Sequence, residues 1–94
     1  HMETPVLFTT SIDCCRLFMN SNSGMPLHRI NPMVGDLVRV HQDSKLQIWM
    51  KVLSRKWLLT NGSTPELIVS LGLPDGYTIP EFEEEMRKNH FPVR

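Results

Sequence analysis

The middle of the chain alternates between apolar and polar residues, and this two-residue period constrains the fold more than any other feature. After Gly35-Asp36, two valines fall on one face of an extended segment and the residues around them on the other, namely Leu37, Arg39 and His41. Such a period is typical of a half-buried β-strand, because successive side chains of a strand point to opposite faces. The sequence therefore predicts β structure from Leu37 to His41.

The next segment, Leu46 to Leu53, fits two periods. A helix capped by Asp43 or Ser44 would gather several apolar residues on one face, but it would leave Ile48 and Val52 on the polar side. A strand divides the residues more cleanly, with Leu46, Ile48, Met50 and Val52 on one face and Lys45, Gln47, Trp49 and Lys51 on the other. The strand is the preferred interpretation, and the helical alternative would make the chain a helical DNA-binding domain.

Further strands are expected on either side of this region. Val6 to Met19 is rich in β-branched and apolar residues and is interpreted as one or two strands. Asn20 to Gly24 contains side chains that bond to the local backbone and a glycine that tolerates positive φ, so a turn is predicted there. Trp57 to Thr60 is predicted to be a separate strand that ends at Asn61-Gly62.

Two helices are predicted in the last third of the chain. Ser63-Thr64-Pro65-Glu66 resembles a capping box and predicts a short helix that ends before Gly72 and Pro74. Thr78-Ile79-Pro80-Glu81 repeats this arrangement before a helix from Phe82 to Asn89. Glutamates begin this second helix and basic residues end it, which suits the helix dipole. The expected fold is thus mainly β with a C-terminal helix.

The length of 94 residues allows a single hydrophobic core, so one domain is expected over residues 3–94. His1-Met2 resembles the residue pair that cloning leaves behind. Ten basic and ten acidic side chains give no net charge, which argues against nucleic-acid binding through a bulk positive field and leaves only a local basic surface for it. No apolar run is long enough to suggest a membrane span.

Nothing in the sequence suggests catalysis, a cofactor or a metal. Glycine-rich phosphate loops, nucleophile elbows and spaced metal-ligand pairs are missing from the sequence, so an enzyme is not expected. The adjacent Cys14 and Cys15, together with three histidines, lack the usual spacing of a structural zinc site. One cysteine in the core and its neighbour facing outward is the simpler interpretation, and both suit a reducing compartment.

Two aromatic residues are predicted to share a face with polar side chains. Strand alternation places Phe18 with Arg16 and Asn20, and it places Trp49 with three basic or amide residues. Aromatic rings interleaved with basic side chains are typical of surfaces that stack the bases of single-stranded nucleic acid. The same pattern also fits a ring that is covered by the terminal helix or by a loop.

The sequence Gly35-Asp36-Leu37-Val38-Arg39-Val40-His41, followed by Lys45-Leu46-Gln47-Ile48-Trp49, resembles the protection-of-telomeres family. The resemblance covers about half of the chain and implies an oligonucleotide-binding (OB) fold. It implies that Phe18 and Trp49 stack on bases of single-stranded, G-rich telomeric DNA. It also implies base-edge or backbone contacts by further residues, namely Arg39, His41, Lys45, Gln47 and Lys51. Other telomere-complex proteins would be partners, and the location would be the nucleus, at chromosome ends.

Two departures from the family pattern bear on these expectations. The segment before Phe18 is too short for two full initial strands, so the small OB-fold-like barrel is expected to be incomplete. Gln42-Asp43-Ser44 replaces a basic residue of the family pattern. The alternative function is a protein–protein interaction module in a nuclear complex, built either on a barrel that does not bind DNA or on an SH3-like or Tudor-like barrel.

Overall fold

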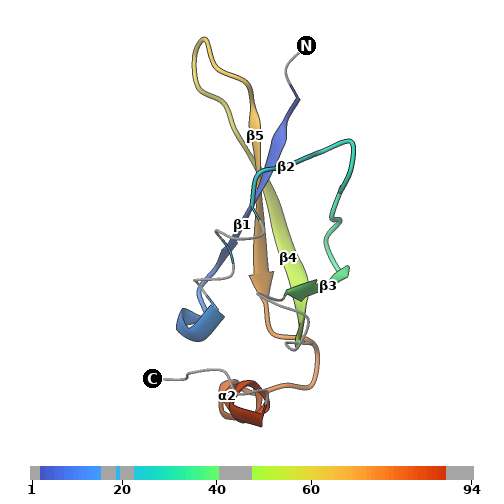
Figure 1. The fold of residues 1–94 in the computed structure, drawn as a ribbon, viewed down its shortest axis with the longest axis vertical. Coiled ribbons are helices and arrows are strands. Elements are labelled where there is room, and N and C mark those ends of the chain that lie inside the picture. The colour runs from blue at the N-terminus through green and yellow to red at the C-terminus, as the bar shows by residue number, and fades with distance from the viewer. Residues whose placement is uncertain (1–2, 16–18, 20–22, 41–47, 89–94) are drawn as a thin grey trace.

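The computed structural model describes residues 3–15, 19, 23–40 and 48–88. These residues form one curled five-stranded sheet with a helix near the C-terminus (Figure 1). The elements in chain order are β1 (Pro5–Thr10), the short 3-10 helix η1 (Asp13–Cys15), β2 (Met25–Pro26), β3 (Leu37–Val40), β4 (Ile48–Leu58), β5 (Glu66–Gly72) and α2 (Ile79–Lys88). The expected fold class is confirmed: the protein is mainly β, and its sheet is compatible with an incomplete, small OB-like barrel.

The sheet has the strand order β2-β1-β5-β4-β3. β1 and β5 run parallel, and all other neighbours are antiparallel. The two edge strands, β2 and β3, do not pair with each other within the described ranges, so the sheet stays open there. The molecule is elongated, at 44 × 24 × 22 Å, with the β4–β5 connection extending from one end of the sheet and α2 lying at the other (Figure 1).

β4 confirms the strand interpretation from Ile48 onward. Met50 and Val52 are completely buried, whereas Trp49, which precedes Met50 and points to the other side of the strand, is half exposed. The predicted break before Trp57 is wrong, because β4 continues through it to Leu58 as one strand of 11 residues. A β-bulge at Leu53 allows this continuity, since it inserts one extra residue into the ladder with β5.

β5 corrects the prediction of a short helix after Ser63. Leu67, Val69 and Leu71 are buried and alternate with less buried residues, as in a strand with one core-facing side. β5 lies between β1 and β4, so both of its edges are paired. These two ladders and the burial of three aliphatic side chains outweigh the local capping signal.

The N-terminal strand is shorter than predicted. β1 ends at Thr10, where the side-chain hydroxyl donates a hydrogen bond to Leu71 O at 2.8 Å and accepts one from Ile12 N at 3.2 Å. The hydroxyl thereby turns the chain away from the sheet, and η1 follows instead of a continued strand. Cys15 in η1 is buried in the core.

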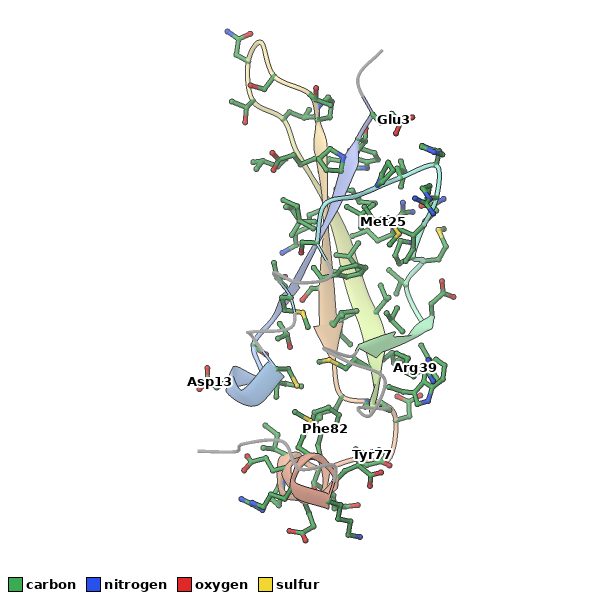
Figure 2. The ribbon with its side chains drawn as sticks, in the orientation of Figure 1. Glu3, Asp13, Met25, Arg39, Tyr77 and Phe82 are labelled. Atoms are coloured by element: carbon green, nitrogen blue, oxygen red, sulfur yellow. The ribbon has the colours of Figure 1, made fainter. Side chains whose placement is uncertain are left out.

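The core lies between the concave side of the sheet and the elements at its ends. Its buried side chains are Val6, Phe8, Ile12, Cys15, Met19, Met50, Val52, Leu67, Val69, Leu71, Phe82 and Met86. Two of these belong to α2, and Phe82 lies between that helix and the lower end of the sheet (Figure 2). The helix therefore covers the core at the lower end of the sheet (Figure 1).

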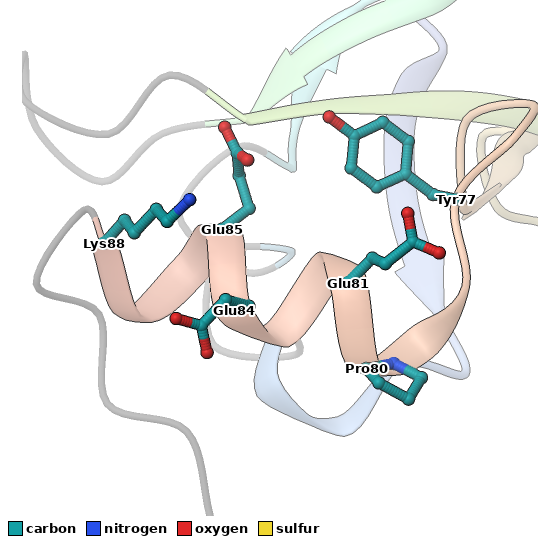
Figure 3. Close-up of a pocket in the computed structure, with 6 residues that line it drawn as sticks. All are labelled: Tyr77, Pro80, Glu81, Glu84, Glu85 and Lys88. Atoms are coloured by element: carbon teal, nitrogen blue, oxygen red, sulfur yellow. The ribbon is translucent and has the colours of Figure 1, made fainter.

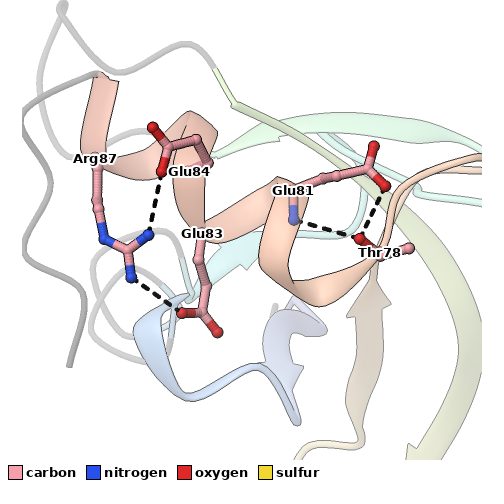
Figure 4. Close-up of polar contacts among 5 residues, drawn as sticks. All are labelled: Thr78, Glu81, Glu83, Glu84 and Arg87. Atoms are coloured by element: carbon pink, nitrogen blue, oxygen red, sulfur yellow. Dashed lines mark hydrogen bonds and ion pairs between the residues drawn. The ribbon is translucent and has the colours of Figure 1, made fainter.

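The N-cap predicted for the last helix is present at α2 (Figure 4). Thr78 Oγ1 donates to Glu81 Oε1 at 2.9 Å and accepts from Glu81 N at 3.3 Å. Near the other end of the helix, Arg87 contacts Glu83 and Glu84 at 3.6 and 3.3 Å. The prediction of this helix is confirmed up to Lys88, and its last predicted residue, Asn89, lies outside the described residues.

Candidate nucleic-acid interface

The candidate site is the side of β3 and β4 that points away from the core. Its members, here called the Trp49 face, are Leu37, Arg39, Trp49, Lys51 and Leu53. Arg39 lies directly opposite Trp49 in the antiparallel ladder, and Leu37 lies opposite Lys51. Directly opposed side chains share one face and have Cβ atoms about 5 Å apart. A guanidinium group and an indole ring therefore stand side by side on this surface.

Strand alternation exposes the ring of Trp49. Its neighbour Met50 is completely buried, so Trp49 must point to the opposite side of β4, where it is 50% exposed. Arg39 is also exposed and projects outward from β3 (Figure 2). Among the described residues, therefore, the Trp49 ring is not covered by α2 or by a loop, and it can accept a flat partner on its accessible side.

A second tryptophan shows how the bulge at Leu53 changes the faces of β4. Trp57 is eight residues after Trp49, and a regular strand would place both on the same side. The extra residue at Leu53 reverses the alternation, so that Trp57 pairs with the buried Leu67 and shares its face. The two indoles are exposed to nearly the same extent, 50% and 52%, but lie on opposite sides of one strand.

The charge of Lys51 is partly neutralised within the chain. Its ammonium group lies 2.9 and 3.1 Å from the two carboxylate oxygens of Asp75, in the connection between β5 and α2. The Asp75 side chain is 88% exposed, whereas that of Lys51 is 29% exposed because the stem lies against the sheet. Arg39 is thus the cation of the Trp49 face for which the structure describes no acidic contact.

The structure brings together three of the seven residues expected at the site. Arg39, Trp49 and Lys51 share the Trp49 face. The other four expected residues, Phe18, His41, Lys45 and Gln47, lie outside the described residues.

Two residues at the candidate site are absent from the sequence prediction. Leu53 follows Trp49 and Lys51 in the same two-residue alternation, so extending that period by one step identifies it as a member of the Trp49 face. Asp75 is placed beside Lys51 by a turn that the sequence Pro74-Asp75-Gly76 does signal. In the sequence prediction, Pro74 serves only to end the short helix.

A second surface lies at α2 and differs in charge. A shallow pocket of about 450 Å³ is lined by Tyr77, Pro80, Glu81, Glu84, Glu85 and Lys88 (Figure 3). Three carboxylates against one ammonium group make it acidic, so it is unsuited to a phosphate backbone. The nucleic-acid candidate therefore remains on the sheet and not at the helix.

The described residues contain no group of three or more His, Cys, Asp or Glu side chains that could hold a metal ion. Within the same ranges, no helix has the length and apolar character needed to cross a membrane. Comparisons of the chain with protein-family models, with curated proteins and with solved structures found no match.

Proposed function

We propose that this chain is an OB-fold-like module that binds single-stranded telomeric DNA through stacking on Trp49 and polar contacts beside it. The observation that carries the proposal is the half-exposed indole of Trp49 directly opposite Arg39 on the neighbouring strand. Each base stacked on an aromatic side chain contributes about 1 to 3 kcal/mol. Stacking of this strength suits a chain with no net charge, because a bulk positive field is not needed.

The geometry of the sheet also supports the proposal. OB folds bind oligonucleotides on the outward surface of neighbouring strands and their adjoining loops. The Trp49 face is such a surface, formed by the first half of β4 and the edge strand β3. Its exposed ring and exposed guanidinium group are the two kinds of side chain that single-stranded nucleic acid favours.

The telomeric part of the proposal rests on the sequence resemblance around Gly35 to Trp49. It gives G-rich single strands as the ligand, other telomere-complex proteins as further partners, and the nucleus, at chromosome ends, as the location. The proposed role is binding without catalysis and without a cofactor.

The test is titration of a G-rich telomeric single strand, about 12 nucleotides long, at low salt in lithium chloride, which disfavours quadruplexes. Trp49→Ala should weaken binding about 5- to 150-fold, the equivalent of one lost stacking contact. Trp57→Ala is the matched control, because that ring has the same exposure on the other side of the same strand. Equal effects of the two substitutions, or no binding by the unsubstituted chain, would contradict the proposal.

Fluorescence separates the two rings in the same titration. In a Trp57→Phe protein only Trp49 emits, and stacking on a base should quench this emission. In a Trp49→Phe protein the emission of Trp57 should stay constant as DNA is added. Quenching of Trp57 alone would place the DNA on the side of the sheet opposite the Trp49 face and would contradict the proposal.

A protein–protein interaction module is the second candidate function. The Trp49 face is apolar as well as basic, because Leu37 and Leu53 beside the ring are 55% and 52% exposed. Exposed apolar groups of this kind are typical of protein interfaces. Under this alternative, Trp49→Ala and Leu37→Ser would both abolish binding to a protein partner, and neither G-rich nor unrelated single strands would bind.

A further inference from the structure

Asp75 forms an ion pair with Lys51, one of the two cations of the Trp49 face. Both carboxylate oxygens lie within 3.1 Å of the Lys51 ammonium group. Lys51 is two residues from Trp49 on the same face of β4, which corresponds to about 7 Å along the strand. A DNA strand stacked on Trp49 would therefore bring its backbone close to this ion pair.

The backbone holds Asp75 in place independently of the ion pair. Tyr77 N donates to Pro74 O at 3.2 Å, which closes a tight turn with Asp75 and Gly76 in its centre. Gly76 has a φ of +87°, a conformation that L side chains rarely adopt and that the third position of a type II turn requires. The carboxylate is thus presented to Lys51 by a preformed turn and would remain near it when the ion pair opens.

An exposed ion pair of this kind is weak. Such pairs contribute at most about 1 kcal/mol, or about fivefold in an equilibrium constant, because water screens them. A phosphate gains little by displacing Asp75, because Lys51 would exchange one anion for another and the freed carboxylate would stay close by. Lys51 therefore makes no phosphate contact in the unsubstituted chain. Under these conditions the lysine adds little net affinity, and fewer counterions are released from the DNA.

We propose that Asp75 limits the electrostatic part of DNA binding at the Trp49 face, so that affinity depends on base stacking more than on the charge of the backbone. The inference rests on the proposed function and deepens it by naming a residue that sets specificity. Asp75 acts through Lys51 and is a positioning residue, because it withholds a cation from the phosphate backbone.

The experiment measures affinity for the same G-rich single strand over a lithium chloride series, starting at about 50 mM. Asp75→Asn should tighten binding about two- to fivefold at low salt, since Lys51 is then available to a phosphate. The slope of log Kobs against log salt should steepen by about 0.7, the value for one additional phosphate contact on a single strand. A merely structural role of Asp75 would not change this slope.

A double-substitution cycle makes the result specific to Lys51. In the otherwise unsubstituted protein, Lys51→Met should leave the slope of log Kobs against log salt nearly unchanged. In the Asp75→Asn protein, Lys51→Met should remove the whole gain in affinity. Glu84→Gln is the matched control for the loss of one negative charge, because Glu84 lies on α2 and contacts Arg87. The control should leave the slope unchanged.

The outcomes distinguish this inference from the proposed function. If Trp49→Ala weakens binding but Asp75→Asn does not alter the slope, the role of Asp75 is overturned and the DNA-binding proposal stands. A gain in Asp75→Asn that persists with Lys51→Met also overturns the inference, because it is then a general charge effect. If neither the unsubstituted chain nor Asp75→Asn binds the single strand, both proposals fail.

Discussion

The side chain of Leu53 lies across the backbone of Gly72, on the face of the sheet that carries Trp49. A Cβ added at Gly72 would overlap with Leu53 Cδ1 and would be 3.0 Å from Leu53 Cγ. Leu53 is the extra residue of the β-bulge, so its side chain takes the space that a side chain at Gly72 would fill. An alanine at this position near the end of β5 would therefore have to displace the Leu53 side chain.

Gly72→Ala should displace the Leu53 side chain and lower the free energy of unfolding by about 1 kcal/mol, the lower end for overpacking, because Leu53 is half exposed and can move. Urea unfolding measures the change. In a Leu53→Ala background the methyl group has room, and Gly72→Ala should then cost little. An equal cost in both backgrounds would show that Leu53 is not the obstacle.

Arg55 should hold the connection between β2 and β3 against the sheet. Its guanidinium group donates to Asn31 Oδ1 at 2.7 Å and to Met33 Sδ at 3.1 Å. Arg55→Met keeps most of the stem but loses these bonds, so the free energy of unfolding should fall by about 1 to 2 kcal/mol. Lys56→Met, at the exposed next residue, is the control and should change stability by less than about 0.5 kcal/mol.

The same hydrogen bond can be tested from its other partner. Asn31→Ala should destabilise the protein, and its cost should not add fully to that of Arg55→Met, because both remove one interaction. Full additivity of the two costs, measured by urea unfolding, would argue against this contact.

The cap of α2 should contribute measurably to stability. Thr78→Ala removes the hydroxyl that accepts a hydrogen bond from Glu81 N, so the free energy of unfolding should fall by about 1 kcal/mol. Thermal unfolding followed by circular dichroism measures this loss. Thr60→Ala, at an exposed residue after β4, should have little effect, and a similar loss from both substitutions would contradict the capping role.

Arg39 should contribute a phosphate contact if the Trp49 face binds DNA. Arg39→Met should reduce affinity for the G-rich single strand and make the salt slope shallower by about 0.7. Lys88→Met, an equal loss of charge on α2, should leave that slope unchanged. Equal changes in the two variants would show that binding follows overall charge and not this face.

The faces of β3 and of β4 up to the bulge could be predicted because alternation is a local property. Val38 packs against the core and Arg39 is exposed, and Met50 is buried beside an exposed Trp49. α2 could be predicted for a similar reason, since its capping interactions span only Thr78 to Glu81. Each of these features depends on residues that are close in sequence.

The capping pattern at Ser63 to Glu66 predicted a helix wrongly, because pairing with a distant part of the chain makes the following residues a strand. β5 pairs in parallel with β1, with Val6 opposite Leu67 across some 60 residues of sequence. No local pattern can anticipate a ladder between segments so far apart. The bulge at Leu53 is also set by the ladder with β5, and it decides the side on which Trp57 lies.

The sequence by itself determined which side chains of β3 and of the first half of β4 face outward, and that a capped helix follows Thr78, because periodicity and capping act within a few residues. The tertiary structure alone decided that β5 is a strand, that Leu53 covers Gly72, and that Asp75 meets Lys51. These three features arise from contacts between segments brought together by folding, where burial and strand pairing outweigh local preference.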